Sequence, residues 1–178
     1  MITYREAVNH YGSQYRLKRA VEIGDITKIE PGLYSFQEEG EAAQIAARHP
    51  KAILTMDTAF YFQDLTDVIP EKWHLATSRT SSRISDPSIQ QHFELDRFFG
   101  VGVIEKEISG TKLRMYDRER LLIELVRKKA DFPYDYYKEL IAVYRQISDK
   151  LDMYKIENYI EKIKGKRNLY RIIQEEVF

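Results

Sequence analysis

Basic and polar side chains suited to contact DNA are concentrated in one short segment near the N-terminus. The segment QYRLKRAVEI (residues 14–23) places Tyr15, Lys18 and Arg19 at positions i, i+3 and i+4. At about 100° per residue these positions share one side of a helix. The apolar residues fall on the opposite side: Leu17, Ala20 and Val21. The exposed side would offer hydrogen-bond donors to base edges and cations to phosphates.

A helix that enters the major groove contacts bases with its outward face and its first residues. The candidate base-contacting residues are therefore Ser13, Gln14, Tyr15, Lys18 and Arg19. Arg16, on the flank of this face, and Lys28, in the β-rich segment that follows, are candidates for phosphate contacts. The alternative is an ordinary core helix with a solvated basic side. We favour DNA recognition because a tight turn precedes the helix and a hairpin follows it.

Further basic side chains occur in a loop and in the C-terminal tail. The Ser-rich loop SRTSSRISDPS (residues 78–88) contains Arg79 and Arg83. Residues 155–171 hold six basic and two acidic residues. Such stretches are more often plain solvated surface. The secondary candidates for contact with nucleic acid or a partner are Arg79, Arg83, Lys164, Lys166 and Arg167.

Sequence patterns typical of catalysis are missing from this chain. It has no Cys, and its His residues, at positions 10, 49, 74 and 92, lack the spacing of metal ligands on one helix. Phosphate-loop and G-x-S-x-G patterns are absent. No Asp or Glu has Lys two residues later, which is the triplet of many nucleases. We therefore expect a protein that is not an enzyme and uses no cofactor or metal.

Length, charge and hydropathy restrict the class of protein further. With 178 residues, against about 150 per domain, the chain has room for one or two domains. Its 28 basic and 28 acidic residues cancel, which argues against histone-like coating of nucleic acid. We find no signal peptide and no stretch near the about 20 apolar residues of a membrane span. These features predict a cytoplasmic protein with no membrane partner.

The N-terminal residues predict two short helices joined by a tight turn. Thr3 and Glu6 have the S/T-x-x-E spacing of a capping box, which predicts that a helix occupies residues 3–11. Gly12 is placed to end that helix in the left-handed conformation. Ser13 is placed to cap the second helix. Two such helices have the arrangement of a helix-turn-helix.

A hairpin is expected directly after these helices. Pro31-Gly32 predicts a type II turn, because Pro presets the first turn position and Gly allows the positive φ of the second. The turn lies between two short β-type runs within residues 25–36. A helix-turn-helix followed by a hairpin is the element order of a winged helix. We therefore expect a winged helix-turn-helix DNA-binding domain over residues 1–37.

The rest of the chain predicts an α+β protein whose second domain is mixed α/β. A helical linker is expected over residues 38–50 and the second domain over residues 51–178, with a small sheet in 51–116 and helices in 117–178. In the sheet region we expect a strand at KAILT, a helix capped by Thr55, a strand at WHLAT and a hairpin that turns at Ser109-Gly110. For DRERLLIELVRKK (residues 117–129) we expect one apolar core face and solvated charges.

The N-terminal segment also resembles a known family. YREAVNHYGSQYRLKRAVEIGDITKIEPGLYSF resembles the winged helix of AbiEi-type antitoxins, the transcriptional regulators of abortive-infection (type IV) toxin–antitoxin systems. Gly24 to Tyr34 match that family's Gly, short strand and Pro/Arg-Gly-Leu/Val-Tyr wing. HPKAILTMDTAFYFQDLTDVIPEKWHLAT and MYDRERLLIELVR are similar to its later motifs. The resemblance covers residues 3–130.

The resemblance implies a bacterial antitoxin that represses its own operon and counteracts a nucleotidyltransferase-like toxin, with the antitoxin activity in the C-terminal domain, residues 51–178. Its partners would be operator DNA with inverted repeats and that toxin, without a stable complex. The family's heads have a further helix before the first one here, and only Met1 and Ile2 precede it. Either the winged helix lacks its first helix or the sequence begins short of it. A protein-interaction adaptor with a degenerate winged helix and an RNA- or nucleotide-binding regulatory protein are the alternatives. The oligomeric state stays open.

Overall fold

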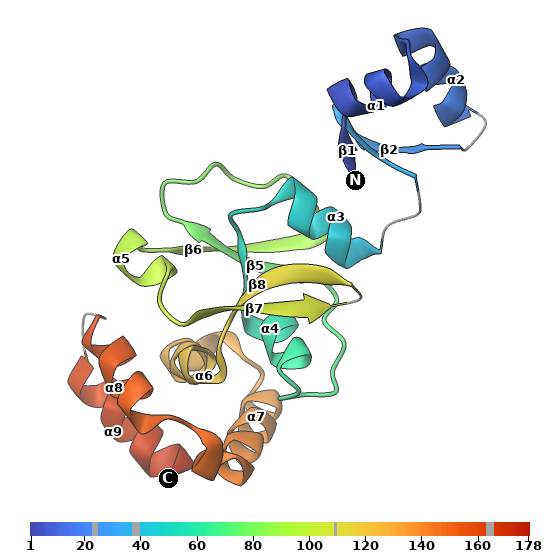
Figure 1. Cartoon of the computed structure of the whole chain (residues 1–178). Helices are drawn as coiled ribbons and strands as arrows, with labels where there is room; N and C mark the ends of the chain where they lie inside the picture. The colour runs from blue at the N-terminus through green and yellow to red at the C-terminus, as the bar shows by residue number, and fades with distance from the viewer. Residues whose placement is uncertain (23–24, 37–39, 109, 163–165) are drawn as a thin grey trace. The chain divides into compact units, whose positions relative to one another are not determined.

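The computed structural model describes residues 1–22, 25–36, 40–108, 110–162 and 166–178, and for residues 166 and 167 the backbone alone. The described residues form an α+β protein with nine α-helices and two small sheets (Figure 1). The chain divides into two compact units. The N-terminal unit comprises residues 1–50 and 107–112, and the C-terminal unit comprises residues 51–106 and 113–178.

Helix α1 (Tyr4–Tyr11) begins with the predicted capping box. The Glu6 N–H donates to Thr3 Oγ1 at 3.3 Å, and the Thr3 N–H donates to Glu6 Oε2 at 2.7 Å. Gly12 ends the helix with φ 78, in the left-handed region. Each helix end thus has the residue that satisfies its free backbone groups, as the sequence predicts.

Helix α2 (Gln14–Glu22) follows after a short turn. Ser13 caps it as predicted, since the Arg16 N–H donates to Ser13 Oγ at 3.2 Å. The expected end of this helix at Ile23 and Gly24 lies outside the described residues. The helix pair is therefore fixed at the turn by a left-handed glycine and a serine cap.

A three-stranded sheet completes the N-terminal unit, with the order β1-β3-β2. Its strands are β1 (Ile2–Thr3), β2 (Thr27–Glu30) and β3 (Leu33–Ser35). Gly32 has φ 91 at the hairpin turn, as the Pro31-Gly32 prediction requires. Strand β1 was not foreseen: Ile2 pairs with Tyr34, and the Tyr4 N–H donates to Gly32 O at 2.7 Å. The residues before α1 are thus the third strand of the sheet.

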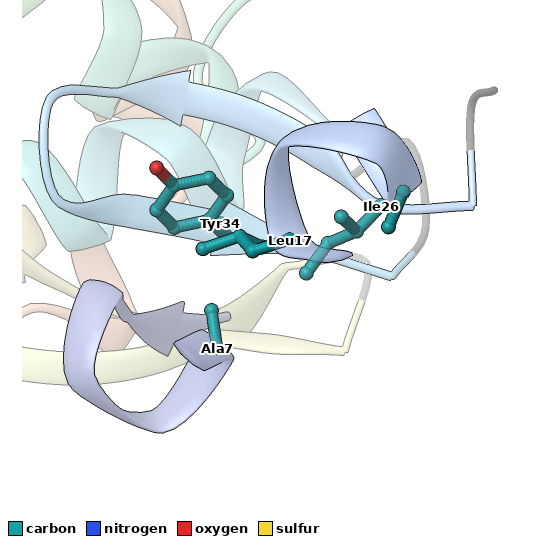
Figure 2. Packing of buried hydrophobic residues seen from close by; sticks show 5 residues of the cluster. Ala7, Leu17, Ile26 and Tyr34 are labelled. Carbon is teal, nitrogen blue, oxygen red and sulfur yellow. The ribbon is translucent and has the colours of Figure 1, made fainter. Parts of the chain in front are cut away.

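The core of this unit lies between the helices and the sheet. Figure 2 shows Ala7 of α1, Leu17 of α2, Ile26 and Tyr34 of β3 converging there. All four are at most 6 % exposed, and Ala20 joins them. The predicted apolar side of α2 therefore faces the core. Its burial leaves the opposite side of the helix for solvent or a partner.

Helix α3 (Glu41–Arg48) occupies most of the predicted helical linker. The start of that prediction, at residues 38 and 39, lies outside the described residues. Ala42 and Ile45 are its buried residues. The helix falls in the N-terminal unit, where Arg48 Nε lies 3.7 Å from Glu30 Oε2 of the hairpin.

The second sheet has five strands in the order β6-β5-β4-β8-β7. The predicted strands are present as β4 (Ile53–Leu54), β5 (Trp73–Ser78), β7 (Val103–Ile108) and β8 (Thr111–Tyr116). The predicted helix follows β4 as α4 (Met56–Phe62). The prediction that the Thr55 side chain caps this helix was wrong, because Thr55 makes no side-chain capping bond. In the predicted turn, Gly110 has φ 78 and Ser109 lies outside the described residues.

Strand β6 (Ile89–Glu94) and the short helix α5 (Asp96–Phe99) were not predicted. Strand β6 pairs in parallel with β5 in continuous register, from Trp73 opposite Ile89 to Ser78 opposite Glu94. Its sequence IQQHFE is too polar to stand out as a strand, because it forms the edge of the sheet.

Helices follow the last strand, as predicted. They are α6 (Arg118–Arg127), α7 (Tyr134–Gln146), α8 (Met153–Glu161) and α9 (Lys166–Val177), with 3-10 turns at Lys129–Asp131 and Ser148–Lys150. Helix α6 contacts α4, α8 and α9. Within the described ranges, no helix has both the length and the apolar character to cross a membrane.

The expectation that the charges of residues 117–129 are solvated was wrong for four of them. Arg120 and Glu124 are fully buried, Asp117 is 6 % exposed and Glu119 is 8 % exposed. Helix α6 is covered on several sides, so residues outside its apolar stripe are enclosed as well. Arg120 is neutralised within the core by Glu124, whose Oε1 lies 2.8 Å from Arg120 Nη2.

Candidate nucleic-acid interface and histidine cavity

The outward side of α2 carries the residues predicted to contact bases. Tyr15 is 78 % exposed, and Gln14, Lys18 and Arg19 are also exposed. Leu17 of the same helix is 2 % exposed and faces the core. The i, i+3, i+4 spacing therefore places an aromatic ring and two cations side by side on the free surface.

The charges on this face are only partly compensated. Arg19 Nη1 lies 3.6 Å from Glu22 Oε2, an exposed pair that contributes little and is readily exchanged for another partner. Ser13 is half-buried, and its hydroxyl oxygen accepts the Arg16 N–H at 3.2 Å. Ser13 therefore has a structural role in capping α2, whatever else it contacts.

The candidates for phosphate contacts in this unit are both exposed. Arg16 lies on α2 and Lys28 lies on β2 of the hairpin. The hairpin is held to the helices by Tyr34, which is 6 % exposed and packs in the shared core. Lys28 and the α2 face thus belong to one packed unit rather than to independent segments.

The secondary basic candidates lie elsewhere in the chain. Arg79 and Arg83 are exposed in the predicted loop, which Gln91 anchors by accepting the Ile84 N–H at 2.8 Å. Lys164 lies outside the described residues, as do the side chains of Lys166 and Arg167. Of these five candidates, only Arg79 and Arg83 have side chains that the structure describes, and both are exposed.

Two of the four histidines, far apart in sequence, meet in the C-terminal unit. His92 Nε2 of β6 lies 3.2 Å from His74 Nδ1 of β5. The parallel register sets His74 opposite Gln90, so His92 is its diagonal neighbour on the same face. On the other side of His74, Nε2 lies 3.7 Å from Asp57 Oδ2 of α4. Sequence reasoning missed this chain of groups because nothing local predicts that β5 and β6 pair.

Burial sets the protonation of these groups. It lowers the pKa of His92 to about 3, and the nearby charge of Lys128 acts in the same direction. It also lowers the pKa of His74, against the opposing effect of Asp57. Burial raises the pKa of Asp57, and the charge of His74 and the Tyr136 hydroxyl oppose that shift. Near neutral pH both imidazoles are therefore uncharged.

These groups line an open cavity of about 980 Å³. Its walls include Asp57 of α4, His74 of β5, His92 of β6 and Tyr136 of α7. Burial and then the charge of Asp57 raise the pKa of Tyr136 to about 12, so its phenol keeps its proton. Within the described part of the chain, no three His, Asp or Glu side chains gather closely enough to hold a metal ion. The cavity therefore offers neutral donors and acceptors beside a carboxylate.

No protein-family model and no curated protein matches this chain. Its function is therefore inferred from its own sequence and geometry.

Proposed function

We propose that this chain is a DNA-binding transcriptional repressor of its own operon and the antitoxin of a type IV toxin–antitoxin system. In this proposal the N-terminal unit is a winged helix-turn-helix. The protein acts in the cytoplasm, is not an enzyme, and counteracts a nucleotidyltransferase-like toxin without a stable complex. The observation that carries the proposal is the outward face of α2, where Tyr15, Lys18 and Arg19 are exposed together.

Physical chemistry favours nucleic acid as the partner of this face. A basic helix side held rigidly by a buried opposite side matches the shape and charge of the major groove. The hairpin β2-β3 follows α2 and presents Lys28, an exposed cation that in this proposal binds the DNA backbone. The first strand β1 pairs with β3 and so braces the hairpin at the edge opposite β2.

A mobility-shift titration on the operon's own promoter tests DNA binding. The variant Lys18→Ala/Arg19→Ala should lose several kcal/mol of binding free energy, at about 1–3 kcal/mol for each good base contact. Arg97→Ala/Lys150→Ala removes the same charge from exposed positions of the C-terminal unit and serves as the matched control, with unchanged operator affinity expected. An affinity that is equal in both variants would refute the assignment to α2.

The antitoxin role needs a separate measurement in cells. Coexpression with a nucleotidyltransferase-like toxin from the adjacent gene should restore growth, and affinity purification should recover little toxin with the chain. Lys18→Ala/Arg19→Ala should derepress the promoter yet still restore growth, because we assign repression to the N-terminal unit and protection from the toxin to the C-terminal unit. Failure to restore growth would remove the antitoxin assignment and leave the repressor assignment standing.

A protein-interaction adaptor is the second candidate, favoured by exposed aromatic surface on the N-terminal unit. Phe36 is 47 % exposed and lies with its ring centre 4.8 Å from that of His10. Salt dependence separates the two candidates. Binding through several phosphate contacts weakens steeply as salt rises, whereas contacts made by aromatic residues persist. Retention of a protein partner at high salt, without an operator shift, would favour the adaptor.

A further inference from the structure

The centre of the outward face of α2 carries three side chains of different chemistry. At about 100° per residue, Tyr15, Arg19 and Glu22 lie opposite the buried Leu17 and Ala20. Tyr15 is 78 % exposed, and the side chains of Arg19 and Glu22 are 68 % and 51 % exposed. The carboxylate of Glu22 is repelled by phosphates, because like charges that face each other are costly. The centre of this face therefore fits over base edges better than along the DNA backbone.

The guanidinium group of Arg19 has one side engaged and one side free. Its Nη1 lies 3.6 Å from Glu22 Oε2, and this pair leaves the N–H groups of Nε and Nη2, which form a fork of two parallel donors. Guanine presents two acceptors in the major groove, O6 and N7, which match such a fork. Adenine presents one acceptor beside an amino donor, so one N–H of the fork would stay unpaired. Arg19 therefore suits guanine better than adenine.

Tyr15 lies one turn before Arg19 on the same face. Four residues at 1.5 Å each separate the two positions by about 6 Å along the helix axis, or about two base-pair steps of the major groove. Among the described residues the Tyr15 side chain has no hydrogen bond and no ring partner. An exposed ring gains free energy when it covers apolar surface, and the apolar group in the major groove is the methyl group of thymine.

We propose that Arg19 and Tyr15 determine the operator sequence, with Arg19 bound to a guanine and Tyr15 packed on the methyl group of a thymine about two base pairs away. This inference rests on the proposed DNA binding and adds which bases the helix selects. Arg16 and Lys28, the candidates for phosphate contacts, contribute affinity without choosing a base.

Selection by the full chain from a library of random-sequence DNA duplexes tests the inference. The enriched duplexes should share a guanine and a thymine at this spacing. In one enriched duplex, 7-deazaguanine then removes the N7 acceptor and uracil removes the methyl group, and both modified bases keep their pairing. We expect about fivefold weaker binding for the first change and about threefold weaker binding for the second. The same changes at positions that selection leaves variable should have no effect.

Variants assign each effect to its side chain, in titrations at low salt that keep weak binding measurable. Arg19→Ala should lose the sensitivity to 7-deazaguanine and keep the sensitivity to uracil, and Tyr15→Ala should do the reverse. Arg16→Ala is the matched control, which should bind more weakly and keep both sensitivities.

Two results would overturn the inference, and they differ in what they leave. Sensitivities that persist in Arg19→Ala or in Tyr15→Ala overturn the base assignment and leave DNA binding standing. A library from which the chain enriches no duplex overturns the base assignment together with the proposed DNA binding.

Discussion

The guanidinium carbon of Arg120 lies 3.1 Å from the centre of the Phe98 ring, deep inside the C-terminal unit. The same carbon lies 4.6 Å from the Tyr116 ring centre. Glu124, fully buried, and Glu94, 4 % exposed, supply the opposite charges, and Glu94 is also paired with Arg127 at 2.6 Å. The cation thus contacts two rings, and its pair with Glu94 joins α6 to the unpredicted strand β6.

Removing the charge of Arg120 should destabilise the C-terminal unit strongly. Arg120→Met leaves Glu124 and Glu94 buried with fewer compensating cations, so the free energy of unfolding should fall by about 3–5 kcal/mol in urea denaturation. Arg171→Met is the control, because its pair with Glu175 at 3.3 Å is exposed. That variant should change stability by less than about 1 kcal/mol. Equal effects would contradict a buried role for Arg120.

Gly102 should tolerate no side chain. Its φ is +72, and a Cβ there would lie 2.6 Å from Arg120 Cβ and 2.9 Å from Tyr159 Cε2. Gly110 has a similar φ of +78 and open space around it, which makes Gly110→Ala a matched control for backbone strain alone. Gly102→Ala should lower the unfolding free energy by about 1–3 kcal/mol more than Gly110→Ala. Equal losses would show that the neighbours move aside.

The features that the sequence predicts correctly are local. Thr3 with Glu6, Gly12, and Pro31-Gly32 each specify a cap or turn through neighbouring residues alone, and the structure has all of them. A capping box or a left-handed glycine depends on backbone geometry within a few residues. The spacing of the apolar residues in α2 predicts its exposed side in the same local way.

The features that the sequence misses depend on distant partners. The burial of Arg120 requires Glu94 and Phe98 from segments that no pattern assigned to the core. The proximity of His74 and His92 requires the parallel pairing of β5 with β6, and edge strand β6 is mostly polar. Charged and polar residues are normally exposed to solvent, so a sequence pattern predicts exposure for them. The buried ion cluster around Arg120 is an exception.

The capping box should contribute measurably to the N-terminal unit. Thr3→Ala removes the acceptor of the Glu6 N–H, so α1 should lose about 1 kcal/mol of stability. Amide hydrogen exchange in α1 should quicken by the corresponding factor. Asn9→Ala, at an exposed position of the same helix, should slow this exchange instead. Ala has the higher helix propensity and should stabilise the helix by up to about 0.7 kcal/mol. If both substitutions slow exchange, Thr3 does not cap α1.

Acid should destabilise the C-terminal unit through its histidine pair. Burial lowers the folded-state pKa of His92 to about 3, from an ordinary value of 6.5. A depressed pKa means that the unfolded chain takes up protons first, so stability is complete above pH 6.5 and is lost as pH falls from there toward 3. The slope should approach about 1.4 kcal/mol per pH unit for one proton. His74, whose pKa is also lowered, adds to the loss, whereas Asp57 opposes it near its own raised pKa.

Urea denaturation at successive pH values measures this slope. His92→Gln removes the group with the lowered pKa, so it should flatten the stability profile below pH 6.5 and leave the residual slope of His74. His10→Gln removes an exposed imidazole from the other unit and should keep the slope of the unsubstituted chain. A profile that His92→Gln leaves unchanged would mean that His92 is protonated as readily in the folded chain as in the unfolded one.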